Sequence, residues 1–180
     1  MQPSEARLRV SGAALGAGMS GAVGVLGVAL EVPYLAIVGG IGVIVGAILG
    51  ALFAPRAVAS DRPVALALML SVLAVPVGGA VVGAIFAFGI AVSQGTAESL
   101  PIVFVTTIFA LPMYPIFAPV VVPISIASVL AGRRLVRVGP RTAALALAGL
   151  AVADVALLVL TPAIAPWVDQ AASWVAGFGR

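Results

Sequence analysis

The 180-residue sequence contains no cysteine, no histidine and no lysine. Without cysteine or histidine, the chain has no thiolate nucleophile and no thiolate or imidazole ligand for a metal or a haem. Histidine acid–base catalysis and the Ser-His-Asp mechanism are excluded for the same reason. The absence of lysine also excludes a Schiff base with pyridoxal phosphate or retinal on a lysine side chain. We therefore expect a non-catalytic protein without a cofactor or a metal.

Charge is scarce as well, because charged residues make up 8% of the chain and apolar residues 63%. Soluble domains carry roughly 25% charged and 45–50% apolar residues. So little polar material cannot cover a surface that faces water, and the composition predicts a membrane protein in contact with the lipid bilayer. The nine basic residues are all arginines in short segments between apolar runs. No basic stripe with interleaved aromatic residues is present, so we expect no nucleic-acid partner.

Five apolar runs are long enough to cross a bilayer, which takes about 20 residues of helix. They cover residues 10–30, 34–54, 64–93, 101–131 and 142–164. Beyond them, Trp167, Trp174 and Phe178 recur at helical spacing, and tryptophan favours the membrane interface. Residues 166–178 are therefore predicted to form a short amphipathic interfacial helix. The predicted fold is an all-α polytopic integral membrane protein, with residues 1–180 as a single membrane domain.

The placement of the arginines predicts the orientation of the five crossings. Counted on alternate sides, Arg180 falls on one side and all the other arginines fall on the opposite side: Arg7, Arg9, Arg56, Arg62, Arg133, Arg134, Arg137 and Arg141. The positive-inside rule places the arginine-rich side in the cytoplasm. We expect a cytoplasmic N-terminus and an external C-terminus. A composition rich in Arg, Ala, Gly and Val favours a prokaryotic source, and hence the prokaryotic plasma membrane.

The first two runs carry small residues at intervals of four. In the first run these are Gly12, Gly16, Ser20 and Gly24, and in the second they are Gly42, Gly46 and Gly50. Small residues at this spacing let membrane helices approach closely. With only Glu31 to Pro33 between the runs, they predict a tight antiparallel hairpin. The same faces could instead dock another membrane subunit or a second copy of the chain, and the sequence leaves both uses open.

The third and fourth runs are too long for simple crossings. Residues 63–97 and 99–132 are free of charge, and continuous helices of that length would measure about 50 Å, against a hydrocarbon core of about 30 Å. We expect a kink or a short re-entrant break in each. The candidate positions are Pro76, Gly78 and Gly79 in the third run and Pro112, Pro115 and Pro119 in the fourth. Such breaks are structural kinks or, in transporters, substrate-lining sites.

Asp154 is the one carboxylate inside a predicted crossing. It lies twelve residues after Thr142, about 18 Å along a helix and therefore near the membrane midplane. A charge at that depth costs at least about 2.5 kcal/mol, so we expect Asp154 to face other helices or a wet cavity. Depth arithmetic places Tyr114 and Ser20 at a similar level. The three residues form a candidate polar cluster, which either binds a cation, a proton or a small ligand or holds helices together by hydrogen bonds.

Two functions fit these patterns. The first is a non-catalytic membrane subunit or scaffold that packs against other membrane proteins or against itself through its small-residue faces. The alternative is a small transporter, or the substrate-binding subunit of one, that uses Asp154 and the broken third and fourth helices. A nucleotide-binding motif is absent, so ATP coupling would have to come from another chain.

Overall fold

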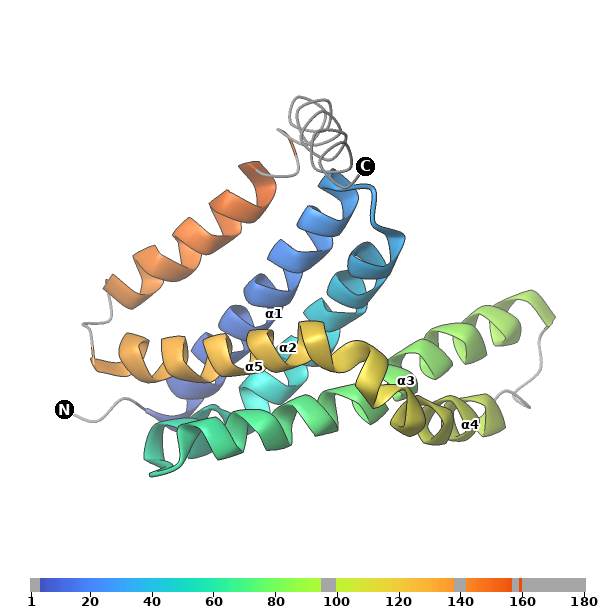
Figure 1. Cartoon of the computed structure of the whole chain (residues 1–180), viewed down its shortest axis with the longest axis horizontal. Helices are drawn as coiled ribbons and strands as arrows, with labels where there is room; N and C mark the ends of the chain where they lie inside the picture. The colour runs from blue at the N-terminus through green and yellow to red at the C-terminus, as the bar shows by residue number, and fades with distance from the viewer. Residues whose placement is uncertain (1–3, 95–99, 138–141, 157–158, 160–180) are drawn as a thin grey trace, which may run out of the picture.

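The computed structural model describes residues 4–94, 100–137, 142–156 and 159. Within these residues the regular structure is entirely helical, without a strand. The numbered elements are α1 (Glu5–Ala29), α2 (Pro33–Ala59), α3 (Pro63–Gln94), α4 (Leu100–Ala110), the short 3-10 helix η1 (Leu111–Met113) and α5 (Tyr114–Arg137). A further apolar helix covers Thr142–Ala156. Figure 1 shows α1 and α2 side by side, with α3 and α5 running across this pair.

Helices α1 and α2 form an antiparallel hairpin with a very short turn. The turn residue Glu31 has a φ of 52°, a left-handed conformation that a residue other than glycine rarely adopts. Two backbone bonds close the end of α1: Glu31 N donates to Val28 O at 3.2 Å, and Val32 N donates to Gly27 O at 2.8 Å. Pro33 then begins α2, where its fixed φ suits a first helical turn. The chain therefore reverses within a few residues.

The two helices of the hairpin meet backbone to backbone. A Cβ atom placed on Gly16 would collide with the backbone of Gly46, and one placed on Gly12 would collide with the carbonyl of Gly50. The same holds nearer the turn, where Gly39 faces Gly24. In a bilayer, such close approach gives van der Waals contact that longer side chains would prevent.

Helix α3 is continuous from Pro63 to Gln94 and contains Pro76 in its interior. Its second half packs against α4, where Gly79 and Gly83 leave room for Thr106 and Val103. Its first half packs against α5 and the end of α2 through a cluster that contains Ala57, Ala67, Leu70 and Val129. Helix α3 thus links the hairpin to the α4–α5 segment.

The fourth predicted run is divided in the structure. Helix α4 ends at Ala110, η1 covers Leu111–Met113 with Pro112 in it, and α5 then continues to Arg137. Proline lacks the donor that an α-helix needs and clashes with the preceding turn, which explains an interruption at this position. Pro119 and Pro123 lie inside α5 without ending it. In Figure 1 the chain bends between the segments labelled α4 and α5.

Several helix ends differ from the predicted runs. Helix α1 begins at Glu5 rather than at residue 10, because Ser4 Oγ caps it by accepting from Arg7 N at 3.4 Å. An ion pair between Glu5 and Arg9 at 2.7 Å adds to this first turn. Helix α2 runs beyond residue 54 and through Pro55 to Ala59. Hydropathy locates the membrane-depth part of a helix, whereas caps determine where the helix ends.

The described helices fit a membrane-embedded protein. Four stretches are long and apolar enough to cross a bilayer: Glu5–Ala29, Pro33–Ala59, Pro63–Ser93 and Pro101–Arg137. Large apolar side chains cover the exterior, with Phe88 and Phe104 exposed by 72% and 69%, which a soluble surface rarely allows over a large area. Of the fifth predicted run, the Thr142–Ala156 helix and Val159 are described. The interfacial helix predicted at residues 166–178 lies outside the described residues.

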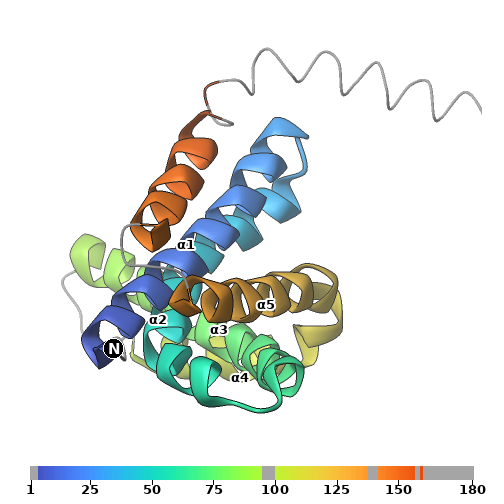
Figure 2. The same ribbon diagram turned by 90° about the vertical axis from the view of Figure 1, so that its left-hand side faces the viewer.

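The basic ends of α2 and α5 come together in the fold. The Arg133 guanidinium of α5 donates a hydrogen bond to the Ser60 carbonyl between α2 and α3. Close by along the chain, the Arg56 guanidinium lies 5.6 Å from the ring centre of Phe53. The end of α5 and the turn between α2 and α3 are therefore neighbours, at the end of the hairpin where α1 begins (Figures 1 and 2).

Candidate functional site

The candidate small-residue faces lie against one another inside the hairpin. Gly12 and Gly16 of α1 contact Gly50 and Gly46 of α2. Gly24 contacts Gly39, which is not part of the four-residue pattern. The remaining members of the pattern also meet, since a Cβ on Gly42 would lie 3.0 Å from Ser20 Cβ. These faces are therefore occupied within the chain and are not a free docking surface.

The three residues of the predicted polar cluster do not share one place. Tyr114 Oη lies 3.0 Å from Ser71 Oγ of α3, in a hydrogen bond where either hydroxyl can donate. Ser20 is buried between α1 and α2, and Asp154 lies beside Gly18 and Gly21, on another face of the same stretch of α1. The structure therefore does not bring the three side chains together, because depth along a helix does not specify which neighbour a side chain faces.

Asp154 borders a small cavity of about 300 Å³ between the Thr142–Ala156 helix and the hairpin. A Cβ atom on Gly21 would lie 3.1 Å from Asp154 Oδ2, and one on Gly18 would lie 3.9 Å from it. The carboxylate therefore lies against α1 at Gly21, while the Leu150 side chain covers Gly18. In the part of the chain that the structure describes, Asp154 accepts no hydrogen bond and forms no ion pair. The wall is otherwise apolar, and its other lining residues are Ala14, Ala17, Val43, Leu147, Leu150 and Ala151. We call this the Asp154 groove.

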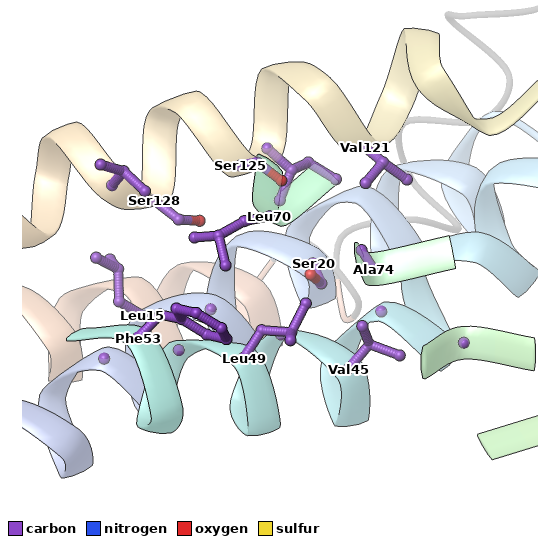
Figure 3. Close-up of a pocket in the computed structure, with 18 of the residues that line it drawn as sticks. Leu15, Ser20, Val45, Leu49, Phe53, Leu70, Ala74, Val121, Ser125 and Ser128 are labelled. Carbon is purple, nitrogen blue, oxygen red and sulfur yellow. The ribbon is translucent and has the colours of Figure 1, made fainter. Parts of the chain in front are cut away.

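A larger cavity of about 540 Å³ lies between the hairpin and the α3–α5 segment. Its walls come from α1, α2, α3, α4, η1 and α5, and they are mainly aliphatic. Figure 3 shows Leu49 and Phe53 of α2 on one side of this space and Val121 of α5 on the other. We call it the central cavity. Small and aliphatic residues form most of its wall, including Gly78 and Gly79, but the sequence patterns did not predict that they enclose a cavity.

The residues predicted as helix breaks have different places in the structure. Gly78 and Gly79 line the central cavity from the continuous helix α3. On the α4–α5 side, Pro112 lies in η1, whose neighbours Ala110 and Met113 line the same cavity. Pro115 and Pro119 belong to α5. The one interruption between described helices at a predicted break position is therefore that at Pro112.

A second polar contact that the sequence did not indicate joins the start of α2 to α5. Tyr34 Oη donates to the Ile116 carbonyl at 2.6 Å, and its ring stacks on Phe117 with centroids 6.1 Å apart. Tyrosine at the membrane interface commonly satisfies both an apolar and a polar neighbour.

The polar side chains at the two cavities are one carboxylate and several hydroxyls. Across residues 4–94, 100–137, 142–156 and 159, no group of three or more His, Cys, Asp or Glu side chains is arranged to hold a metal ion. The groove supplies one carboxylate and the central cavity supplies hydroxyls. Comparison with models of protein families, with curated proteins and with solved structures finds no match to this chain.

Proposed function

We propose that this protein is a non-catalytic subunit of a membrane assembly, with five crossings and a cytoplasmic N-terminus in a prokaryotic plasma membrane. In this arrangement the α1–α2 hairpin provides a platform, and the Asp154 groove receives a polar side chain from one helix of a partner protein. The apolar exterior of the described helices supports the membrane setting. The hydrogen bond from Arg133 to Ser60 brings the basic end of α5 beside the turn between α2 and α3. Basic residues on one side of the bundle support the proposed orientation.

The observation that carries the proposal is the position of the Asp154 carboxylate. It lies against Gly21 at the wall of the Asp154 groove, while Leu150 occupies the space beside Gly18. A carboxylate at membrane depth requires a partner or water, because hydrocarbon satisfies no hydrogen bond. Since the described residues provide no such partner, a second protein that brings a donor into the groove would complete the site.

The charge pattern indicates what that partner carries. All arginines of this chain lie outside the central parts of the predicted crossings, and lysine and histidine are absent. A second copy therefore brings no cation to the depth of Asp154. The complementary partner is a different chain whose transmembrane helix carries an arginine or lysine near its middle. Intramembrane charged residues commonly pair in this way.

The test is co-purification from native membranes in a mild detergent, with mass spectrometry to identify any stoichiometric partner. The variants are Asp154→Asn, which keeps the shape but removes the charge, and Asp154→Glu, which keeps the charge. Removing one partner of a buried ion pair costs about 3–5 kcal/mol. We therefore expect at least tenfold less partner with Asn and near-normal recovery with Glu.

The matched control is Asp61→Asn, which neutralises an exposed carboxylate between α2 and α3. This variant should recover the partner as the wild type does. Replacing the partner's basic residue by Gln should reproduce the loss caused by Asp154→Asn. The proposal fails if the Asn variant retains its partner in full, or if the recovered protein has no basic residue within a membrane span.

Transport is a second candidate function, favoured by the interruption at η1. Because Ala110 and Met113 flank Pro112 and line the central cavity, altered backbone borders an internal space, as in the broken helices of transporters. Proton movement into liposomes would be followed with an enclosed pH-sensitive dye after an acid pulse. If the chain conducts protons through Asp154, wild type but not Asp154→Asn acidifies the lumen. Equal traces from both would exclude that role.

A further inference from the structure

The serine and threonine side chains of helices α1, α3, α4 and α5 fall into two groups. In the first group, each hydroxyl donates to a carbonyl three or four residues earlier in its own helix, the usual arrangement for such residues in membrane helices. This group comprises Ser11, Ser71, Ser93, Thr106 and Thr107. These residues lie on α1, α3 and α4, and the cavity lining includes Ser11 and Thr106.

The second group consists of Ser20, Ser125 and Ser128. None of the three makes a hydrogen bond to any residue that the structure describes, and Ser128 Oγ is fully buried without a partner. All three line the central cavity. Hydroxyls that ordinarily bond to their own helix are therefore left without such bonds where helices α1 and α5 border this space.

These serines stand on opposite walls of the cavity. Ser125 and Ser128 are three residues apart on α5 and so share one face of that helix. Figure 3 shows them across the cavity from Ser20 of α1, with Leu70 between the two walls. Such an arrangement offers donors and acceptors to one polar group within an otherwise apolar enclosure.

The lining also restricts the charge of an occupant. No Asp, Glu or Arg borders the central cavity, so an ion would lack a counter-charge in a region of low dielectric constant. The volume of about 540 Å³ falls in the range of small-molecule sites, roughly 300–1,000 Å³. Apolar walls with a few placed polar groups are also typical of such sites.

We propose that the central cavity binds an uncharged amphiphile, with its hydrocarbon body against the aliphatic walls and a hydroxyl or carbonyl group hydrogen-bonded to Ser125 and Ser128. The ligand class is that of long-chain alcohols and neutral glycerides. This site is separate from the Asp154 groove, whose lining residues do not border the central cavity. The proposal therefore does not depend on the presence of a partner protein.

The test is photolabelling of the full chain in phospholipid nanodiscs. The probe is a twelve-carbon primary alcohol with a diazirine in its chain, and labelled residues are identified by mass spectrometry. We expect labels on cavity residues such as Leu70 and Val121. Unlabelled 1-dodecanol should suppress this labelling at least tenfold more effectively than n-dodecane or dodecanoate, since one lacks the polar group and the other carries a charge.

Variants separate binding from general attraction to the apolar surface. Ser125→Ala combined with Ser128→Ala should reduce cavity labelling at least fivefold, whereas Ser93→Ala, which alters an exposed self-bonded hydroxyl, should not. Ala74→Phe should fill the cavity and prevent its labelling. If the Phe variant does not fold, the double variant Ser125→Ala and Ser128→Ala still tests the proposal. Labels confined to lipid-facing residues, equal competition by dodecane, or unchanged labelling of the double Ala variant would overturn the proposal. Labelling by a diazirine phospholipid alone would show that bilayer lipid, and not a neutral amphiphile, fills the space.

Discussion

The α1–α2 interface and the interface between this hairpin and the α3–α5 segment differ in how helices meet. In the hairpin, glycine backbones touch and no Cβ fits between Gly16 and Gly46. Across the second interface, larger aliphatic side chains meet around a cavity of about 540 Å³. Close backbone contact leaves no alternative packing, whereas a side-chain-lined space accepts changes of volume. The hairpin interface thus has no room for a larger side chain, whereas the second interface encloses free volume.

The largest expected effect comes from filling the hairpin interface. Gly46→Leu would press a side chain against the Gly16 backbone, which has no free volume to give, and overpacking of this kind costs about 3 kcal/mol. Thermal unfolding in detergent should show a large loss of stability. Gly40→Leu is the matched control on the same helix, because no atom lies within 4 Å of its Cβ position. Equal stability of the two variants would show that α1 and α2 are not in close contact.

A substitution at the wall of the central cavity should have the opposite effect and raise thermal stability. A Cβ on Gly78 would lie 3.8 Å from Ile41 and Val45, which is ordinary contact, and alanine favours a helix over glycine by about 0.5–1 kcal/mol. Gly78→Ala should therefore raise the unfolding temperature slightly. Gly46→Ala, measured in the same experiment, should lower the unfolding temperature despite the same gain in helix propensity. A destabilising Gly78→Ala would mean that the cavity is closed around α3.

The smallest effect concerns the hydroxyl contact of Tyr114. Tyr114→Phe removes the 3.0 Å bond to Ser71 but leaves the Ser71 bond to Leu68 O in place. Hydrogen bonds between membrane helices contribute about 0.6 kcal/mol on average, and we expect a loss of that order. Comparison with Tyr34→Phe, which removes a bond to Ile116 O, would test whether α5 is held at both contacts. A loss well above that of Tyr34→Phe would assign Tyr114 a larger role.

Sequence patterns predicted the helical runs better than they predicted contacts between them. Apolar length located the long helices, but the start of α1 at Glu5 depends on the Ser4 cap, which hydropathy ignores. The four-residue spacing identified Gly12 and Gly16, whereas the pairing of Gly24 with Gly39 depends on how the turn at Glu31 sets the register.

The candidate site illustrates the same limit. Depth arithmetic grouped Tyr114 with Asp154, but the direction of a side chain around its helix axis depends on tertiary packing, and Tyr114 faces Ser71. Distance along the sequence predicts how deep a residue lies in the membrane, but it does not predict the direction in which its side chain points around the helix axis. The central cavity was not predictable either, since it results from the crossing of helices whose individual side chains, such as Leu49 and Val121, are unremarkable.

The central claim is that the α1–α2 hairpin crosses the membrane twice, with its short turn outside and its other end in the cytoplasm. The native chain has no cysteine, so one introduced thiol is a unique label. Glu31→Cys and Ala59→Cys would each be exposed to a membrane-impermeant maleimide in intact cells and again after permeabilisation. The account predicts that Cys at position 31 reacts in intact cells and that Cys at position 59 reacts only after permeabilisation. Reaction at position 59 in intact cells, with position 31 protected, would contradict it.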